Sequence, residues 1–147
     1  MESSRIQKVI GNHEKGYNCC QAIVCAYCDM FNLDEETVFK VTEGLGFGMG
    51  SAGTCGAVSA MVIMAGLKNS AGKIVEPLTK HSTYALDKKL LDMFYNKNKS
   101  VMCVDLKGII EGRNPLRSCN GCIVDGARLV EREIFPGKFE EYVGEEY

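Results

Sequence analysis

The chain has 147 residues, of which 46% are hydrophobic and 24% charged, and its formal net charge is −2. These values predict one soluble domain over residues 1–147, large enough to bury a core. They exclude the strongly basic surface that binds nucleic acid or anionic membranes, and no apolar run reaches the ~20 residues of a membrane span. Because the first residues lack the apolar stretch of a signal peptide, we expect a cytoplasmic protein.

Apolar residues recur at helical spacing along the chain and predict an all-α fold. After a polar segment that is expected to be a loop, Asn18 is a capping residue for a helix over 19–31. Asp34 has the same role for a helix over 35–43. A glycine-rich loop follows, and then an almost wholly apolar helix over 55–68, which we expect to be buried on all sides.

The second half of the chain continues the helical pattern. A long amphipathic helix is expected to open at Pro77 or Thr79 and run to residue 97, and a short helix carries 103–108. The last helix covers 119–135, and the acidic tail over 136–147 is expected to be loosely ordered. The predicted architecture is therefore a helical bundle around one buried central helix. The apolar stripe of the long helix consists of Tyr84, Leu86, Leu90, Leu91, Phe94 and Tyr95.

The glycine-rich segment "GMGSAG", residues 48–53, formally matches the G-x-G-x-x-G pattern of dinucleotide-binding proteins. That pattern requires a preceding strand within a βαβ unit, whereas a helix precedes it here, so we reject this interpretation. The glycines instead place Cys55 in the first turn of the apolar helix. Free N–H groups and the helix dipole stabilise a thiolate there and lower the thiol pKa. The alternative is that Cys55 is only a small residue at a crowded helix start.

Eight cysteines are unexpected in a cytosolic chain, where most thiols stay reduced. They indicate metal ligands or redox-active thiols, although free cysteine is also a common core residue. Cys119 and Cys122 form a C-x-x-C pair that opens the last helix, a setting that supports a redox disulfide or two metal ligands. Cys25 and Cys28 form a second pair within a helix, and we expect both to be buried and unreactive.

The chain has two histidines, His13 and His81. Neither lies near a nucleophile in the sequence, so a cysteine–histidine hydrolase has no support from the pattern. We expect both to be solvated surface residues.

Four stretches together resemble the C_GCAxxG_C_C family of redox-active proteins: "GYNCCQAI", the glycine run leading into "CGAVSA", a cysteine before "DLKG", and "CNGCIVDGARLVE". The resemblance covers roughly 16–133. It implies four shared cysteines, which correspond here to Cys19, Cys55, Cys103 and Cys119, with Cys122 as the alternative to Cys119. Ala60 stands where the family motif has its second glycine, a departure that concerns helix packing rather than the thiol.

Three functions remain open from the sequence. The first is a thiol-based redox protein, and so a thiol-dependent oxidoreductase, in which Cys55 and a partner cycle between dithiol and disulfide. The second is a metalloprotein in which the four family cysteines hold an iron–sulfur cluster or zinc. The third is a non-catalytic interaction protein with reduced core cysteines. A redox function implies a redox partner protein, and a homodimer stays open. Because each family cysteine lies near a predicted helix start, we expect the four to meet at one end of the bundle.

Overall fold

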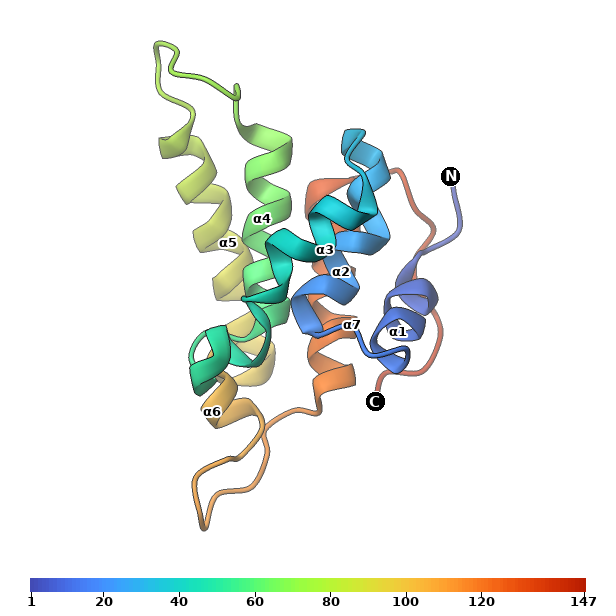
Figure 1. Cartoon of the computed structure of the whole chain (residues 1–147), viewed down its shortest axis with the longest axis vertical. Helices are drawn as coiled ribbons and strands as arrows, with labels where there is room; N and C mark the ends of the chain where they lie inside the picture. Colours follow the sequence, from blue (N-terminus) through green and yellow to red (C-terminus); the bar gives the residue numbers. More distant parts are fainter.

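The computed structural model describes residues 1–147 and is built from helices, with no β-sheet (Figure 1). The all-α fold class that the sequence predicts is confirmed. No helix combines the length and the apolar character that a membrane crossing requires. The helices are α1 (Ile6–Glu14), α2 (Cys19–Tyr27), α3 (Glu35–Glu43), α4 (Gly56–Asn69), α5 (Lys80–Asn98), α6 (Cys103–Leu106) and α7 (Cys119–Leu129).

Two helices, α2 and α4, form the centre of the bundle. α4 packs against α2, α5 and α7, and residues 56–61 of its first half are all buried. The first half of α4 is thus buried as expected, whereas residues 66–69 near its end are partly or fully exposed. α2 shares the central position, because residues 20–27 are buried as well. Neither helix has a polar face in these stretches, as expected for helices that are covered on all sides.

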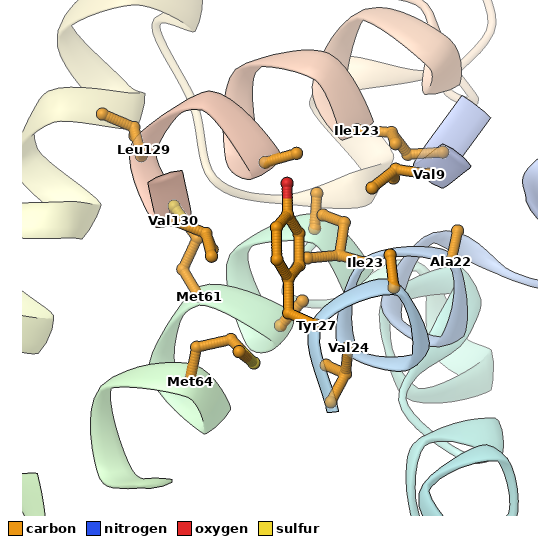
Figure 2. Close-up of a cluster of buried hydrophobic side chains, with 14 of the residues drawn as sticks. Val9, Ala22, Ile23, Val24, Tyr27, Met61, Met64, Ile123, Leu129 and Val130 are labelled. Atoms are coloured by element: carbon orange, nitrogen blue, oxygen red, sulfur yellow. The ribbon is translucent and has the colours of Figure 1, made fainter. Parts of the chain in front are cut away.

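The core surrounds Tyr27 near the end of α2. Figure 2 shows its ring between Met61 and Val130 on one side and Ile23 on the other. Its hydroxyl donates a hydrogen bond to the buried Glu131 carboxylate, with the oxygens 2.7 Å apart. Burying a side chain of this size contributes on the order of 1.5–3 kcal/mol, and the hydrogen bond avoids the penalty of a buried unpaired hydroxyl.

Capping explains why α3 has the bounds that the sequence predicts. The Asp34 side chain accepts a hydrogen bond from the Thr37 N–H at 2.8 Å.

Two other predicted helices change from α-helix to another helix type before they end. α2 continues as one 3-10 turn, η1 (Cys28–Phe31), which stops at the left-handed residue Asn32. α7 continues as one π-helical turn, η3 (Val130–Ile134).

Three segments differ from the sequence-based expectation or add to it. The expected N-terminal loop contains helix α1, which buries Ile6, Val9 and Ile10 against the core. On α5, Leu90 and Phe94 are buried as expected, but Tyr84 and Tyr95 are 62% and 52% exposed, because only one edge of this outer helix faces the bundle. The segment 136–147 runs over the surface, where Phe139 and Tyr142 are buried and Arg128 forms ion pairs with Glu141 and Glu146.

Candidate functional site

A small cavity lies at the end of the bundle where α2, α4, α6 and α7 begin, the lower end in Figure 1. Its volume is about 170 Å³. The structure brings together Cys19, Cys55, Cys103 and Cys119, as their predicted positions at helix starts suggested. Cys122 joins them, so five of the eight cysteines line what we call the thiol pocket.

Capping residues place two of the five thiols. Asn18 accepts a hydrogen bond from the Gln21 N–H at 2.9 Å, and the Gln21 side chain accepts one in return from the Asn18 N–H. The next residue, Cys19, therefore begins α2. Ser118 accepts a hydrogen bond from the Gly121 N–H at 2.9 Å, so Cys119 begins α7 in the same way. Each cap fixes a thiol at the end of a helix.

The backbone holds the segments that carry Cys55 and Cys103 side by side. The Cys55 N–H donates to the Val101 carbonyl oxygen at 2.8 Å, and the Cys103 N–H donates to the Gly53 carbonyl oxygen at 2.6 Å. Cys55 is the residue that precedes the first turn of α4 rather than a member of it. Its carbonyl accepts the first hydrogen bonds of that helix, from the N–H groups of Val58 and Ser59.

Two glycines allow the walls of the pocket to approach each other. A Cβ atom on Gly56 would lie 3.1 Å from both the Cβ of Cys19 and the backbone nitrogen of Cys20. A Cβ on Gly121 would lie 2.4 Å from Nε of Arg117. A larger residue in place of Gly56 would therefore crowd the backbone where α4 begins against α2, whereas in place of Gly121 it would displace the flexible Arg117 side chain.

Cys19 and Cys119 interact with each other, and we call them the outer pair because both are partly exposed. The Cys19 thiol, which can donate a hydrogen bond to the neighbouring thiolate, lowers the pKa of Cys119 to about 6, with further help from the charges of Lys107 and His13. The same interaction raises the pKa of Cys19. Within the outer pair, Cys119 is therefore the thiol that loses its proton more readily, and Cys19 is the one that keeps it.

Cys55 and Cys122 form an inner pair, with exposures of 5% and 3%. Hydrogen bonding from the Cys122 thiol lowers the pKa of Cys55 despite its burial, and the N–H groups of Ala57 and Val58 add to this effect. The pKa of Cys122 is raised in return. The pKa of Cys55 is thus lowered, as the sequence predicts, and the main cause is the hydrogen bond from the Cys122 thiol. Cys103 stands outside both pairs, and burial raises its pKa.

The pocket wall contains three basic side chains and no carboxylate. The ammonium group of Lys107 lies 5.1 Å from the ring centroid of Phe47. Arg117 is held by the buried Asp125, with Nε and Oδ2 3.1 Å apart. His13 Nδ1 lies 2.8 Å from Oδ1 of Asn120.

The expectation for His13 was wrong. His13 belongs to α1 and lines the thiol pocket, whereas we expected a solvated residue in a loop. The spacing of Ile6, Val9 and Ile10 was the signal that pointed to a helix there. His81 is exposed on α5, as expected.

The other three cysteines lie in the core, away from the pocket. Cys25 and Cys28 are buried, which confirms this part of the prediction, and their low reactivity stays a prediction. Burial raises the pKa of Cys25 to about 12 and is also the main reason for the raised pKa of Cys28. Cys20 is equally buried, and its pKa is about 12 for the same reason.

The sequence left two cofactors open, an iron–sulfur cluster and zinc. Either of them would use the pocket thiols as ligands. All eight cysteines are free thiols, and no group of three or more His, Cys, Asp or Glu side chains has the arrangement that would hold a metal ion. The geometry thus presents pairs of thiols rather than a preformed site for one ion.

Comparison with known proteins adds one finding. No curated protein and no solved structure matches the chain. A family model described as "Putative redox-active protein (C_GCAxxG_C_C)" matches residues 17–133, which include all five cysteines of the thiol pocket. The match spans most of the chain and agrees with the resemblance seen in its four short motifs. The chain therefore belongs to the C_GCAxxG_C_C family.

Proposed function

We propose that the protein is a thiol-based redox protein whose pocket cysteines cycle between dithiol and disulfide. The observation that carries this proposal is the presence of five cysteines in one pocket, with two pairs in which one thiol lowers the pKa of its neighbour. A thiolate is the form that attacks a disulfide, and a neighbouring thiol can then resolve the mixed disulfide. In each cycle two protein thiols lose two electrons and two protons, and a disulfide co-substrate becomes two thiols.

The two pairs have different tasks in this proposal. The outer pair meets the co-substrate, because Cys119 is partly exposed and carries the thiolate. The inner pair is too deeply buried for direct contact and exchanges with the outer pair. Cys55, the key thiol in the sequence-based hypothesis, is the nucleophile of the inner pair. The pocket can then store two disulfides.

Disulfide mapping tests this proposal. The reduced protein is treated with diamide, a small neutral oxidant, and its bridges are identified by mass spectrometry of a non-reduced digest. We expect Cys19–Cys119 and Cys55–Cys122, with Cys103 free. A Cys119→Ser variant should lose the first bridge and form the second far more slowly, because the inner pair is oxidised through the outer pair, and Cys25→Ser should keep both. Eight free thiols after oxidation, or a bridge between Cys25 and Cys28, would contradict the proposal.

A metal centre in the same pocket is the second candidate function. The observation that favours it is the convergence of Cys19, Cys55, Cys103 and Cys119 from four helix starts. Thiolates are the preferred ligands of iron–sulfur clusters and are common ligands of zinc. A Cys103 variant distinguishes the metal centre from the dithiol–disulfide cycle, because Cys103 is a ligand in the first and belongs to neither thiol pair in the second. If the pocket holds metal, protein purified without oxygen should contain iron or zinc and lose it in Cys103→Ser. If it cycles between dithiol and disulfide, that variant should form both bridges.

A further inference from the structure

The charge of the thiol pocket is opposite to that of the whole chain. The chain has a net charge of −2, yet the pocket wall has basic side chains and no carboxylate. Arg117 is neutralised by Asp125. Lys107 is not, because the nearest carboxylate in the sequence, Asp105, pairs with Arg113 at 3.1 Å. The charge of Lys107 is therefore available to a molecule that approaches the pocket thiols.

Lys107 lies close to the outer pair. Lys107 lines the same pocket wall as Cys119 and Cys103, and its charge also helps to lower the pKa of Cys119. The side chain is exposed and extends over the ring of Phe47, which also lines the pocket. A negative group bound by Lys107 would thus stand beside the reactive sulfur of Cys119.

The size of the pocket restricts what can reach that sulfur. At about 170 Å³ the cavity is smaller than the ~300–1,000 Å³ of sites for drug-sized ligands. Its thiols lie inside the cavity rather than on a flat surface. A disulfide within a folded protein carries two chain segments, which this cavity has no room for. A molecule of a few heavy atoms on each side of its S–S bond fits the available space.

We infer that the pocket takes small anionic disulfides as its oxidising co-substrates, with Lys107 as the residue that binds their negative group. This inference rests on the proposed function and names the substrate class of the same site. The Cys119 thiolate attacks one sulfur, a bond forms between the two, and the first thiolate of the co-substrate leaves. The Cys19 thiol then loses its proton and attacks the Cys119 sulfur, which releases the second. One disulfide is reduced to two thiols, and the outer pair is oxidised by two electrons.

Three disulfides of similar size test the inference: dithiodiglycolate, with two negative charges, neutral 2-hydroxyethyl disulfide, and cystamine, with two positive charges. The rate of thiol loss from the reduced protein is divided by the rate of each disulfide with free 2-mercaptoethanol, which removes differences in intrinsic reactivity. We expect the anion to react about tenfold faster than the neutral compound at low salt, and the cation more slowly than both. High salt should reduce these differences.

Variants of Lys107 give the decisive comparison. Lys107→Gln should abolish the preference for the anion, and Lys107→Glu should reverse it, while the exposed control Lys88→Gln on α5 keeps it. Lys107 also affects the pKa of Cys119, so a loss of rate that is equal for all three disulfides would overturn the inference. Equal normalised rates in the unaltered protein would do the same. Both results leave the proposed function intact, because that function is tested separately by the disulfides that diamide forms.

Discussion

The thiol pocket and the core contain cysteines of opposite character, although both groups are largely buried. Cys119 has the thiol of Cys19 as its neighbour and the charges of Lys107 and His13 nearby, so its pKa is about 6. Cys25 lies inside α2 among apolar side chains, and its pKa is about 12. In the helix interior the N–H groups are already paired and cannot stabilise an anion. The immediate neighbours of a thiol and the depth of its burial therefore decide the direction in which its pKa is shifted.

The sharpest test of this comparison is the rate of alkylation by iodoacetamide. At pH 7 a thiol of pKa about 6 is ~90% thiolate, and one of pKa about 12 only ~0.001%. We expect Cys119 to be labelled on the order of 10⁴–10⁵-fold faster than Cys25, as followed by mass spectrometry of quenched samples. Rapid labelling of Cys25 or Cys28 in the folded protein would break the comparison.

The pH dependence of the alkylation rate tests whether a lowered pKa is the cause of fast labelling at Cys119. Only the thiolate reacts, so the rate at Cys119 should be nearly constant above pH 7 and fall about tenfold between pH 7 and pH 5. Cys119 in protein unfolded by urea supplies the control, because there the rate should still be rising at pH 8. A folded-state profile with its midpoint near pH 8.5 would mean that the pocket does not activate this thiol.

For the stability of the fold, we expect the core cysteine Cys25 to matter more than the pocket cysteine Cys119. Cys25→Ser places a hydroxyl at a site that is 2% exposed, which we expect to lower the free energy of unfolding by about 1–3 kcal/mol. Cys119→Ser changes a partly exposed residue and should cost about 0.5 kcal/mol or less. Urea unfolding followed by circular dichroism under reducing conditions measures both. Equal losses would remove the distinction between core and pocket cysteines.

A last prediction concerns the contact between α2 and α4. Gly56→Ala would put a methyl group 3.1 Å from the Cβ of Cys19, and we expect a loss of about 1 kcal/mol and altered labelling of the pocket thiols only. Gly66, on the same helix, has open space around it. Gly66→Ala should therefore raise stability by ~0.5–1 kcal/mol and leave all labelling rates unchanged. Identical effects of the two substitutions would show that Gly56 is not needed for close approach.

Local signals in the sequence were enough for much of the fold. Asn18 and Asp34 mark where α2 and α3 begin, and the apolar run of α4 indicates its burial. They failed for α1, because only Ile6, Val9 and Ile10 of that short helix are apolar and charged residues surround them. Packing against the core, which no local pattern reveals, supplies the stability of such a helix.

The candidate site was predictable in membership but not in pairing. The link between a cysteine and a helix start is local, so the meeting of the four family cysteines could be anticipated. The neighbours of each thiol depend on how the helix ends are arranged around the cavity. That arrangement puts Cys122 beside Cys55, and it brings His13 into the wall. Both results come from contacts between segments that are distant in the chain.

The thiol pocket draws its cysteines from α2, α4, α6 and α7, helices spread over nearly the whole chain. Segments so far apart meet late in folding, since closing long loops is entropically unfavourable. Until then Cys119 is an ordinary thiol, mostly protonated at neutral pH. The lowered pKa of Cys119 is thus a property of the folded chain alone, since it depends on Cys19, Lys107 and His13, which other helices bring to the pocket.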